Sequence, residues 1–304
     1  MSQQPIKILC IVGPTASGKS DAALTLANKL SGEIVSADSM QIYRYMDIGT
    51  AKPSKSEQEY VKHWMIDIVD PDADYSVNNY VSDVTTVIEE ISSRGKLPIV
   101  CGGTGLYLNS LIYDYKMTDA GKDDVYRNEL YDFADKYGAE ALHNKLQEVD
   151  AVSAQSIHPN NVKRVVRALE VYHCTGIPMS LQNNNKKTLS SKFNPKIIGI
   201  SRERSVLYDR INKRVDIMVK NGLIDEVKSL LDKGYTSNLN SMQGIGYKEL
   251  IPYINGESTL EDAVDLIKKN TRNYAKRQLT WFNAIEYIEW KNSSDDILSM
   301  DFEL

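Results

Sequence analysis

The segment Gly13-Pro-Thr-Ala-Ser-Gly-Lys-Ser20 is the feature that most restricts what this 304-residue chain can fold into. It matches the pattern G-x-x-x-x-G-K-[ST] at every defined position, and such a loop joins a strand to the start of a helix. An apolar run at 6–12 precedes it, and alanines and leucines at helical spacing follow it from Lys19. The sequence therefore predicts an α/β core with this P-loop at the carboxyl end of its first strand.

Three further short apolar segments, at 33–37, 99–101 and 196–201, are expected to be strands. They alternate with helical patterns at 19–32 and 80–93, which is typical of parallel strands joined by right-handed helical connections. The predicted fold class is α/β, with a P-loop NTPase-like, mostly parallel sheet flanked by helices and an inserted all-helical subdomain.

A long helical stretch separates the third and fourth expected strands. Its segments with apolar residues at helical spacing are 123–137, 139–148 and 161–173. We predict that residues 118–187 form the inserted helical subdomain. Residues 1–117 and 188–304 would then form the α/β core, with C-terminal helices from Ser205 onward.

Composition limits the function classes. The net charge of −5 argues against a general nucleic-acid binder, so any RNA surface must be local, as at 266–285, which has five basic and no acidic residues. Three separated cysteines without a C-x-x-C pair suit a reducing compartment and exclude a disulfide framework. The N-terminal apolar run is too short for a signal peptide or membrane span, so a cytoplasmic protein without membrane contact is expected.

The P-loop predicts a ligand with a diphosphate group. Its glycines let successive backbone N–H groups point at phosphate oxygens, and the helix N-terminus adds partial positive charge. Lys19 would reach the outer phosphate, and the Ser20 hydroxyl would bind Mg²⁺. The predicted diphosphate-binding residues are Gly13, Pro14, Thr15, Ala16, Ser17, Gly18, Lys19 and Ser20.

A P-loop does not by itself identify ATP as the ligand. A kinase or ATPase also needs an acidic residue at the end of an apolar strand. The strand at 99–101 ends instead in Gly102-Gly103-Thr104-Gly105, and the acidic segment 65–70 is broken by Asp67 and is expected to be a turn. A kinase or NTPase therefore lacks an identifiable acidic group.

Six segments carry a family resemblance when they are taken together and in order. They are GPTASGKS (13–20), DSMQIYRYMDIGTAKP (38–53), GGTGLYL (102–108), IHPNNVKRVVRALEVY (157–172), MQGIGYKEL (242–250) and AKRQLTWF (275–282). Over roughly residues 6–290 the chain resembles tRNA dimethylallyltransferases, also called tRNA isopentenyltransferases, of the bacterial type without a zinc finger. Ser20 stands where these often have threonine, and either hydroxyl can ligate magnesium.

The resemblance implies transfer of a dimethylallyl group from dimethylallyl diphosphate to the exocyclic amine of the tRNA adenosine that is 3′-adjacent to the anticodon. The diphosphate is the leaving group, which the P-loop and Mg²⁺ would stabilise. By the same resemblance Asp38 takes the proton of the attacking amine, while Thr104 and Arg214 contact the diphosphate. Arg210 and Arg214 are expected on a helix that Ser205 caps.

The implied partner is a tRNA anticodon stem-loop from which the target adenosine is flipped out. The residues expected to contact tRNA are Asp38, Ser39, Met40, Gln41, Arg127, Lys163, Arg164, Arg167, Gln243, Gly244, Lys248, Lys276, Arg277 and Gln278. From residue type alone, Lys163, Arg164 and Arg167 fit an ordinary solvated helix face equally well. Trp281 and Phe282 are expected in the core.

Other functions stay open on the residues alone. A P-loop small-molecule kinase or NTPase would bind ATP, whereas an isoprenyl transferase acting on free adenine nucleotides would use the same donor chemistry. A non-enzymatic RNA-binding module would have no use for a P-loop beside Asp38. We expect a monomer with Mg²⁺ as its cofactor; the sequence does not say which tRNAs are modified or whether ATP binds.

Overall fold

The computed structural model describes residues 4–113, 121–182, 189–298 and 300. The chain divides into two compact units: Met1–Ile112 with Ser190–Leu304, here the core unit, and Tyr113–Leu189, here the helical unit. The predicted boundaries at 117/118 and 187/188 lie outside the described residues. Each unit is described by itself below.

The core unit contains a six-stranded, all-parallel sheet in the order β3-β2-β4-β1-β5-β6. The strands are β1 (Ile6–Val12), β2 (Gly32–Ser36), β3 (His63–Trp64), β4 (Leu97–Gly102), β5 (Phe193–Ile200) and β6 (Ile288–Lys291). The four inner strands are those predicted from the sequence, so the fold class is confirmed. Only the short outermost strands β3 and β6 were not predicted.

The register of the inner strands decides where the functional loops meet. Val12 at the end of β1 pairs with Gly102 of β4 and Gly199 of β5. The P-loop and the turn Gly102-Gly103-Thr104-Gly105 therefore leave neighbouring strands at the same edge of the sheet. Further hydrogen bonds join this turn to the end of β2: the Ala37 N–H donates to Cys101, and the Thr104 N–H donates to Ala37.

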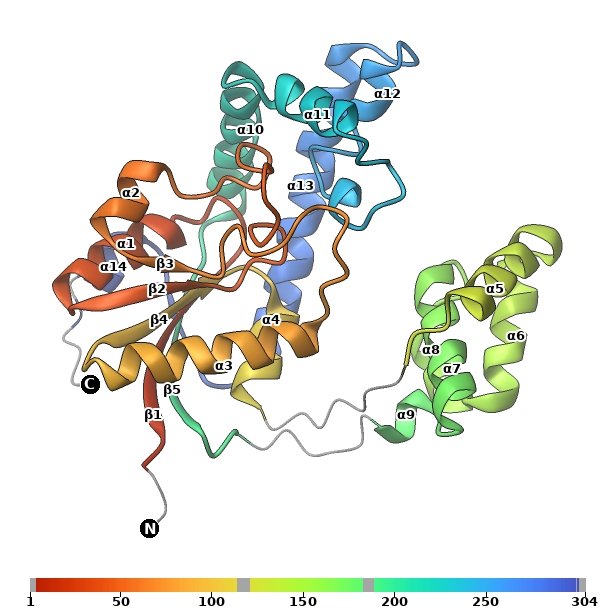
Figure 1. Cartoon of the computed structure of the whole chain (residues 1–304), viewed down its shortest axis with the longest axis horizontal. Coiled ribbons are helices and arrows are strands. Elements are labelled where there is room, and N and C mark those ends of the chain that lie inside the picture. The colour runs from red at the N-terminus through yellow and green to blue at the C-terminus, as the bar shows by residue number, and fades with distance from the viewer. Residues whose placement is uncertain (1–3, 114–120, 183–188, 299, 301–304) are drawn as a thin grey trace. The chain divides into compact units, whose positions relative to one another are not determined.

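The core unit also contains helices, which pack on the sheet or on one another (Figure 1). They are α1 (Lys19–Lys29), α2 (Lys55–Tyr60), α3 (Val77–Ser93), α4 (Gly105–Ile112), α10 (Arg204–Lys220), α11 (Leu223–Asp232), α12 (Leu250–Ile254), α13 (Leu260–Asn283) and α14 (Ser294–Leu298), with a 3₁₀ turn at Ser241–Gln243. Helix α1 packs with α14, and α3 packs with α4. The buried aliphatic side chains between α1 and the strands form one hydrophobic cluster, which stabilises the P-loop end of the sheet.

A second hydrophobic cluster joins the C-terminal helices to the segment that follows β2. Ile42 and Met46 pack there with Tyr247, Leu250 and Ile267, all at most 2% exposed. The segment 38–53 is thus seated on α10–α13, although these elements lie far apart in the sequence.

Helix α10 begins at Arg204 and is not capped by Ser205. Its N-cap is Glu203, whose carboxylate accepts the N–H groups of Ser205 and Val206. The serine hydroxyl itself donates to the same carboxylate. The cap prediction was wrong because the acidic residue two positions upstream takes the role.

The helical unit contains α5 (Asp124–Tyr137), α6 (Ala139–Val149), α7 (Ala151–Ser156), α8 (Val162–Thr175) and α9 (Met179–Gln182). The three longer helices coincide with the predicted ones, and their buried leucines and valines form the unit's own core.

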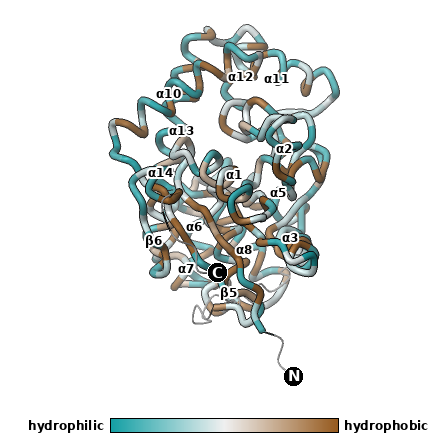
Figure 2. Tube along the Cα trace, turned by 90° about the vertical axis from the view of Figure 1, so that its left-hand side faces the viewer, coloured by the Kyte–Doolittle hydropathy of each residue, from teal (hydrophilic) through white to brown (hydrophobic). Residues whose placement is uncertain are grey.

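In Figure 2 brown, hydrophobic segments run through the strands near the β5 label, while teal and brown alternate along the helices. None of the described helices is long and apolar enough to cross a membrane.

Candidate active site

A cavity of about 550 Å³ lies in the core unit at the carboxyl ends of the strands. The predicted site residues that line it are Thr15, Lys19, Ser20, Asp38, Ser39, Met40, Gln41, Arg214, Gln243, Gly244, Lys248, Arg277 and Gln278. Segments separated by most of the chain therefore meet around one space, as expected for ligands of open α/β sheets.

The P-loop adopts a backbone that its glycines permit. Gly18 has φ 100°, in the left-handed region, immediately before α1 begins. A Cβ at Gly13 would lie 2.5 Å from the carbonyl oxygen of Ile200, so the close packing of the loop on β5 requires glycine there. Ala16 also has a positive φ of 63°, a conformation that costs free energy in a residue with a side chain.

Long-range side-chain contacts hold the strained part of the loop. They are Thr15 N–H to Gln278 Oε1 (2.9 Å), Arg210 Nε to the Ala16 carbonyl (2.8 Å) and Arg202 Nε to the Ser17 carbonyl (2.7 Å). Three successive loop residues are thus fixed by side chains from three later segments. Such contacts preorganise backbone N–H groups for an anionic ligand.

Two cations and one carboxylate lie near one another in the cavity. Burial lowers the pKa of the Lys19 ammonium, and the nearby Arg214 charge also lowers it, whereas Asp38 raises it. Lys19 Nζ lies 3.4 Å from the Pro14 carbonyl oxygen. Among the described residues, none forms a hydrogen bond or ion pair with the mostly buried Arg214. A multivalent anion is the ligand that would satisfy both cations.

Asp38 lies two residues beyond the end of β2 and lines the same cavity. Its Oδ1 accepts the N–H of Met40 at 2.9 Å, a local turn that orients the group. Within the described part of the chain this is the one donor to the carboxylate, so Oδ2 is left able to accept a proton or hydrogen bond from a ligand.

Thr104 lies beside the cavity rather than among its lining residues. Its Oγ1 accepts the Ser39 N–H at 3.0 Å and lies 3.3 Å from the Ser39 hydroxyl. A Cβ at Gly102 would lie only 2.1 Å from the Ala37 carbonyl oxygen, so glycine is required for this turn to pack on the end of β2. The structure therefore brings Thr104 next to the segment that carries Asp38.

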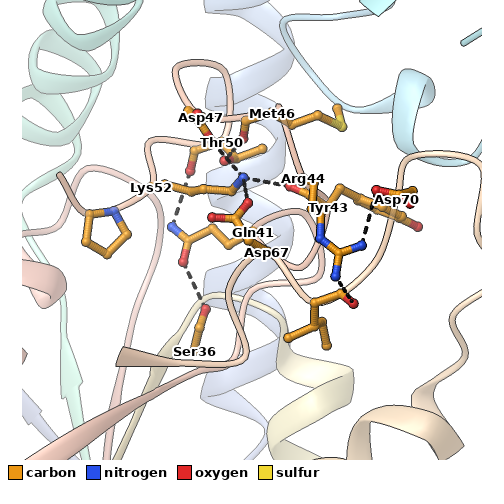
Figure 3. A network of polar contacts seen from close by, with 12 residues as sticks. Ser36, Gln41, Tyr43, Arg44, Met46, Asp47, Thr50, Lys52, Asp67 and Asp70 are labelled. Carbon is orange, nitrogen blue, oxygen red and sulfur yellow. Dashed lines mark hydrogen bonds and ion pairs between the residues drawn. The ribbon is translucent and has the colours of Figure 1, made fainter. Parts of the chain in front are cut away.

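Gln41 holds the segment 38–53 together. Its Oε1 accepts the Ser36 hydroxyl at 2.9 Å, and its Nε2 donates to the carbonyls of Thr50 (3.3 Å) and Ala51 (3.2 Å) (Figure 3). Both amide hydrogens of this predicted tRNA contact are thus committed within the loop. What remains for a ligand is one lone pair on Oε1.

Lys52 performs a similar role in the same segment. Its ammonium, with the side chain 3% exposed, donates to the Tyr43 carbonyl at 2.6 Å, to Asp47 at 2.7 Å and to Asp67 at 2.5 Å (Figure 3). Asp67 has a positive φ of 55° and lies in the segment 65–70, which is a bend at 65–67 followed by a single bridge from Val69 to Tyr43, and not the predicted turn. The acidic residues of this region therefore serve to hold the loop.

Glu226 of α11 is a structural residue that the sequence did not indicate. Its carboxylate accepts the N–H groups of three successive residues, Asp47, Ile48 and Gly49, at 2.7–3.0 Å, and the Tyr247 hydroxyl at 2.7 Å. An acidic residue in the first turn of a helix is a common feature, so no local signal distinguishes this one.

The segment 242–250 faces the cavity through Gln243, Gly244 and Lys248. A Cβ at Gly244 would lie 2.5 Å from Met40 Cε, so the two predicted tRNA contacts are packed directly against each other. Gln243 Nε2 donates to the Ser237 carbonyl at 2.7 Å.

On α13 the predicted tRNA contacts differ in exposure. Lys276 and Arg277 are exposed, whereas Gln278 is 5% exposed and donates through Nε2 to the Gly103 carbonyl at 2.9 Å. Phe282 is fully buried as predicted, but Trp281 is 43% exposed, so the core prediction for it was wrong.

The remaining predicted tRNA contacts belong to the helical unit. Arg127 and Arg167 form ion pairs with Glu170 at 2.8 and 2.7 Å, and the side chain of Glu170 is 0% exposed. Lys163 and Arg164 are exposed on the first turn of α8. Arg127 and Arg167 are thus ion-paired, whereas Lys163 and Arg164 form no ion pair with any described residue.

The donors around the P-loop fit a magnesium ion that arrives with phosphate. Ser20 is exposed in the first turn of α1 and lines the cavity. Among the described residues there is no group of three histidine, cysteine or acidic side chains that could hold a metal ion. Mg²⁺ keeps several waters and commonly binds through one or two protein ligands plus phosphate oxygens, which the Ser20 hydroxyl could complete.

Comparisons with known proteins agree with this geometry. A family model described as IPP transferase matches residues 41–285. The tRNA dimethylallyltransferase of Acetivibrio thermocellus is 50% identical over 288 residues, which are 95% of this chain and 92% of the relative. That of Thermoanaerobacter sp. (strain X514) is 49% identical over 287 residues, or 94% and 91% of the two chains.

Two solved structures are also similar. The tRNA isopentenylpyrophosphate transferase from Bacillus halodurans superposes with a TM-score of 0.70 at 46% identity, covering 96% of this chain and 93% of that one. A eukaryotic dimethylallyltransferase described as acting on tRNA superposes with a TM-score of 0.78 at 31% identity, over 96% and 76% of the two chains.

Proposed function

The chain belongs to the IPP transferase family, and from this premise we propose that it transfers a dimethylallyl group from dimethylallyl diphosphate to tRNA. The proposed acceptor is the exocyclic amine of the adenosine 3′-adjacent to the anticodon. The observation that carries the proposal is one cavity that holds two cations, Lys19 and Arg214, and the carboxylate of Asp38. Only one oxygen of this carboxylate accepts a hydrogen bond from a described residue.

The cations and the P-loop suit the donor half of the reaction. In the proposed step the allylic C–O bond breaks and its electron pair leaves with the diphosphate. Backbone N–H groups of the loop, the N-terminus of α1, Lys19 and Arg214 would stabilise the charge that develops. When Mg²⁺ is bound, with Ser20 as its protein ligand, it neutralises part of the same charge.

Asp38 suits the acceptor half. The adenine nitrogen forms the new bond to the allylic carbon, and its surplus proton moves to Asp38 Oδ2. The Met40 N–H on Oδ1 orients the carboxylate for this transfer. A positioned base of this kind contributes about 10²–10⁴-fold to the rate.

The competing activities find less support in the site. An NTPase or kinase would need an acidic group at the end of β4, which is occupied by Gly102 and Gly103. A transferase for free nucleotides would not need the exposed Lys276 and Arg277, of which Arg277 lines the cavity. We therefore propose an anticodon stem-loop as the partner, and separately propose that the enzyme is a monomer.

The first experiment mixes the purified protein, Mg²⁺ and labelled dimethylallyl diphosphate with unmodified tRNA, and in parallel with AMP or ATP. Label in tRNA alone supports the proposal. Label in AMP alone would assign the nucleotide-level transferase instead, and ATP hydrolysis without transfer would assign an NTPase.

The second experiment tests the base. Asp38→Asn keeps the shape of the side chain but cannot accept the proton, so single-turnover transfer should fall about 10²–10⁴-fold while tRNA affinity stays within a few-fold. Asp21→Asn is the matched control, because it removes one negative charge from the lining of the same cavity. Equal losses in both variants would mean that charge, and not proton transfer, is what Asp38 supplies.

A further inference from the structure

Gln278 joins two loops of the proposed site through the two ends of its amide. Oε1 accepts the Thr15 N–H of the P-loop at 2.9 Å, and Nε2 donates to the Gly103 carbonyl of the turn after β4, also at 2.9 Å. The side chain is 5% exposed, so water competes little for either bond. The two loops come from neighbouring strands and carry the diphosphate cradle and Thr104 respectively.

The turn after β4 is shaped to receive α13. A Cβ at Gly103 would lie 2.2 Å from Gln278 Nε2, and a Cβ at Gly105 would lie 2.2 Å from Trp281 Cδ1. A side chain at either position would force Gln278 or Trp281 to move from its place against the turn. Gln278 and Trp281, one turn apart on α13, therefore contact the two glycines on either side of Thr104.

Thr104 is fixed between these contacts. Its backbone N–H donates to Ala37 at 3.1 Å, and its hydroxyl accepts the Ser39 N–H at 3.0 Å. Without the Gln278 amide, the Gly103 carbonyl would lose its link to the P-loop, while the hydrogen bonds of Thr104 with Ala37 and Ser39 would remain. The Thr15 N–H would also lose its partner, next to the strained Ala16.

We propose that Gln278 is a positioning residue for the transfer reaction, which sets the distance between the P-loop and the turn that carries Thr104. This inference rests on the proposed function and adds a residue to it. It differs from the prediction that Gln278 contacts tRNA, since both ends of its amide are bonded inside the protein. The exposed Lys276 and Arg277 remain the residues of this segment available to RNA.

Two substitutions test the amide itself. Gln278→Met has similar size but forms neither bond, and Gln278→Glu keeps the acceptor for Thr15 while it loses the donor to Gly103. We expect kcat to fall about 10–100-fold in both, because small misplacement of reacting groups is costly. The Kd for tRNA should stay within about two-fold. Asp265→Asn, at an exposed position of the same helix outside the proposed site, is the control and should leave both kcat and the Kd for tRNA unchanged.

A double-mutant cycle separates positioning from general destabilisation. Gly103→Ala places a methyl group on the amide nitrogen of Gln278 and should reproduce the loss of kcat. If the two residues act as one bridge, the combined variant should lose little more than either single one. Additive losses of kcat, or losses that follow the melting temperature of each variant, would overturn the inference.

Binding of Mg²⁺ with inorganic pyrophosphate gives a readout that does not need the transfer reaction. The Gln278→Met protein should bind it several-fold more weakly than the wild type in calorimetry. Were the wild type inactive on dimethylallyl diphosphate, the proposed function would fail and this weakening would still support the bridge. A Kd for tRNA that rises in Gln278→Met, with an unchanged rate at saturation, would assign Gln278 to RNA binding instead.

Discussion

Arginines predicted to be functional are used in opposite ways in the two units. In the core unit, Arg214 is mostly buried, lies near Asp38 and has no hydrogen bond or ion pair to any described residue. In the helical unit, Arg127 and Arg167 both pair with the fully buried Glu170. The first arrangement leaves a cation for a ligand to satisfy, whereas the second satisfies a carboxylate that would otherwise be buried alone.

Neither a motif match nor a positive charge shows whether an arginine binds a ligand or stabilises the fold. Glu170 also accepts the Asp123 N–H at 3.1 Å, so the cluster connects α8 to the start of α5. Burial raises the pKa of Glu170, but the bonds from Arg127 and Arg167 outweigh it and leave the pKa lowered. Substituting Arg127 or Arg167 should therefore lower the stability of the fold more than it weakens tRNA binding.

The largest effect is expected at Arg214. Arg214→Gln removes one of the two cations around the proposed diphosphate, so kcat/KM should fall by about 10²–10³-fold, with tRNA affinity nearly unchanged. Steady-state kinetics with labelled donor measure this loss. Lys213→Gln, at the preceding position of the same helix and 71% exposed, should retain wild-type kinetics. An Arg214→Gln enzyme within a few-fold of wild type would remove Arg214 from the donor site.

Those parts of the fold with local signals could be predicted. The four inner strands, α1 and the P-loop follow from apolar runs, helical spacing and one complete motif. Asp38 could be placed because it directly follows a predictable strand. The helices of the insertion followed from periodicity in the same way.

Contacts between distant segments could not be predicted. Glu226, Gln278 and Glu170 owe their roles to partners brought near by tertiary packing, and their local sequence is ordinary. Strands β3 and β6 are too short to show a period. Trp281 was expected in the core, but its ring contacts Gly105 and the residue is 43% exposed.

The next effect tests the paired side of the comparison. Glu170→Gln removes the charge that Arg127 and Arg167 share, so the free energy of unfolding should fall by about 2–3 kcal/mol. We expect a smaller loss than for a fully buried ion pair, because the two arginine side chains are 28% and 44% exposed. Chemical denaturation measures it. Transfer kinetics that collapse while stability stays unchanged would place Glu170 in the reaction.

A smaller, pH-dependent effect is expected at Glu33, the corresponding buried carboxylate of the core unit. The Arg94 guanidinium lowers its pKa from 4.5 to about 2; burial opposes this shift, and Lys96 and Trp64 add to it. Its contribution to stability is therefore complete above pH 4.5 and is lost as the pH falls toward 2. Glu33→Gln should lower the free energy of unfolding at pH 7 by about 1.5–3 kcal/mol and flatten its dependence between these pH values. Parallel slopes in wild type and variant would show that other groups control acid unfolding.

The smallest effect compares exposed and paired cations within the helical unit. Lys163 and Arg164 are exposed at the start of α8, so changing both to glutamine should weaken tRNA binding by several-fold and lower the salt dependence of log K by about 1–2. The paired double variant, Arg127→Gln with Arg167→Gln, removes the same formal charge. If the paired arginines are scaffold, this variant should lower stability while its salt dependence stays within about 0.5 of wild type. Measuring the Kd for tRNA over a salt series, at a temperature where both variants are folded, shows whether the paired arginines contact tRNA. Equal salt slopes for the two variants would show that the Glu170 ion pairs open when tRNA binds, so that the paired arginines contact tRNA as well.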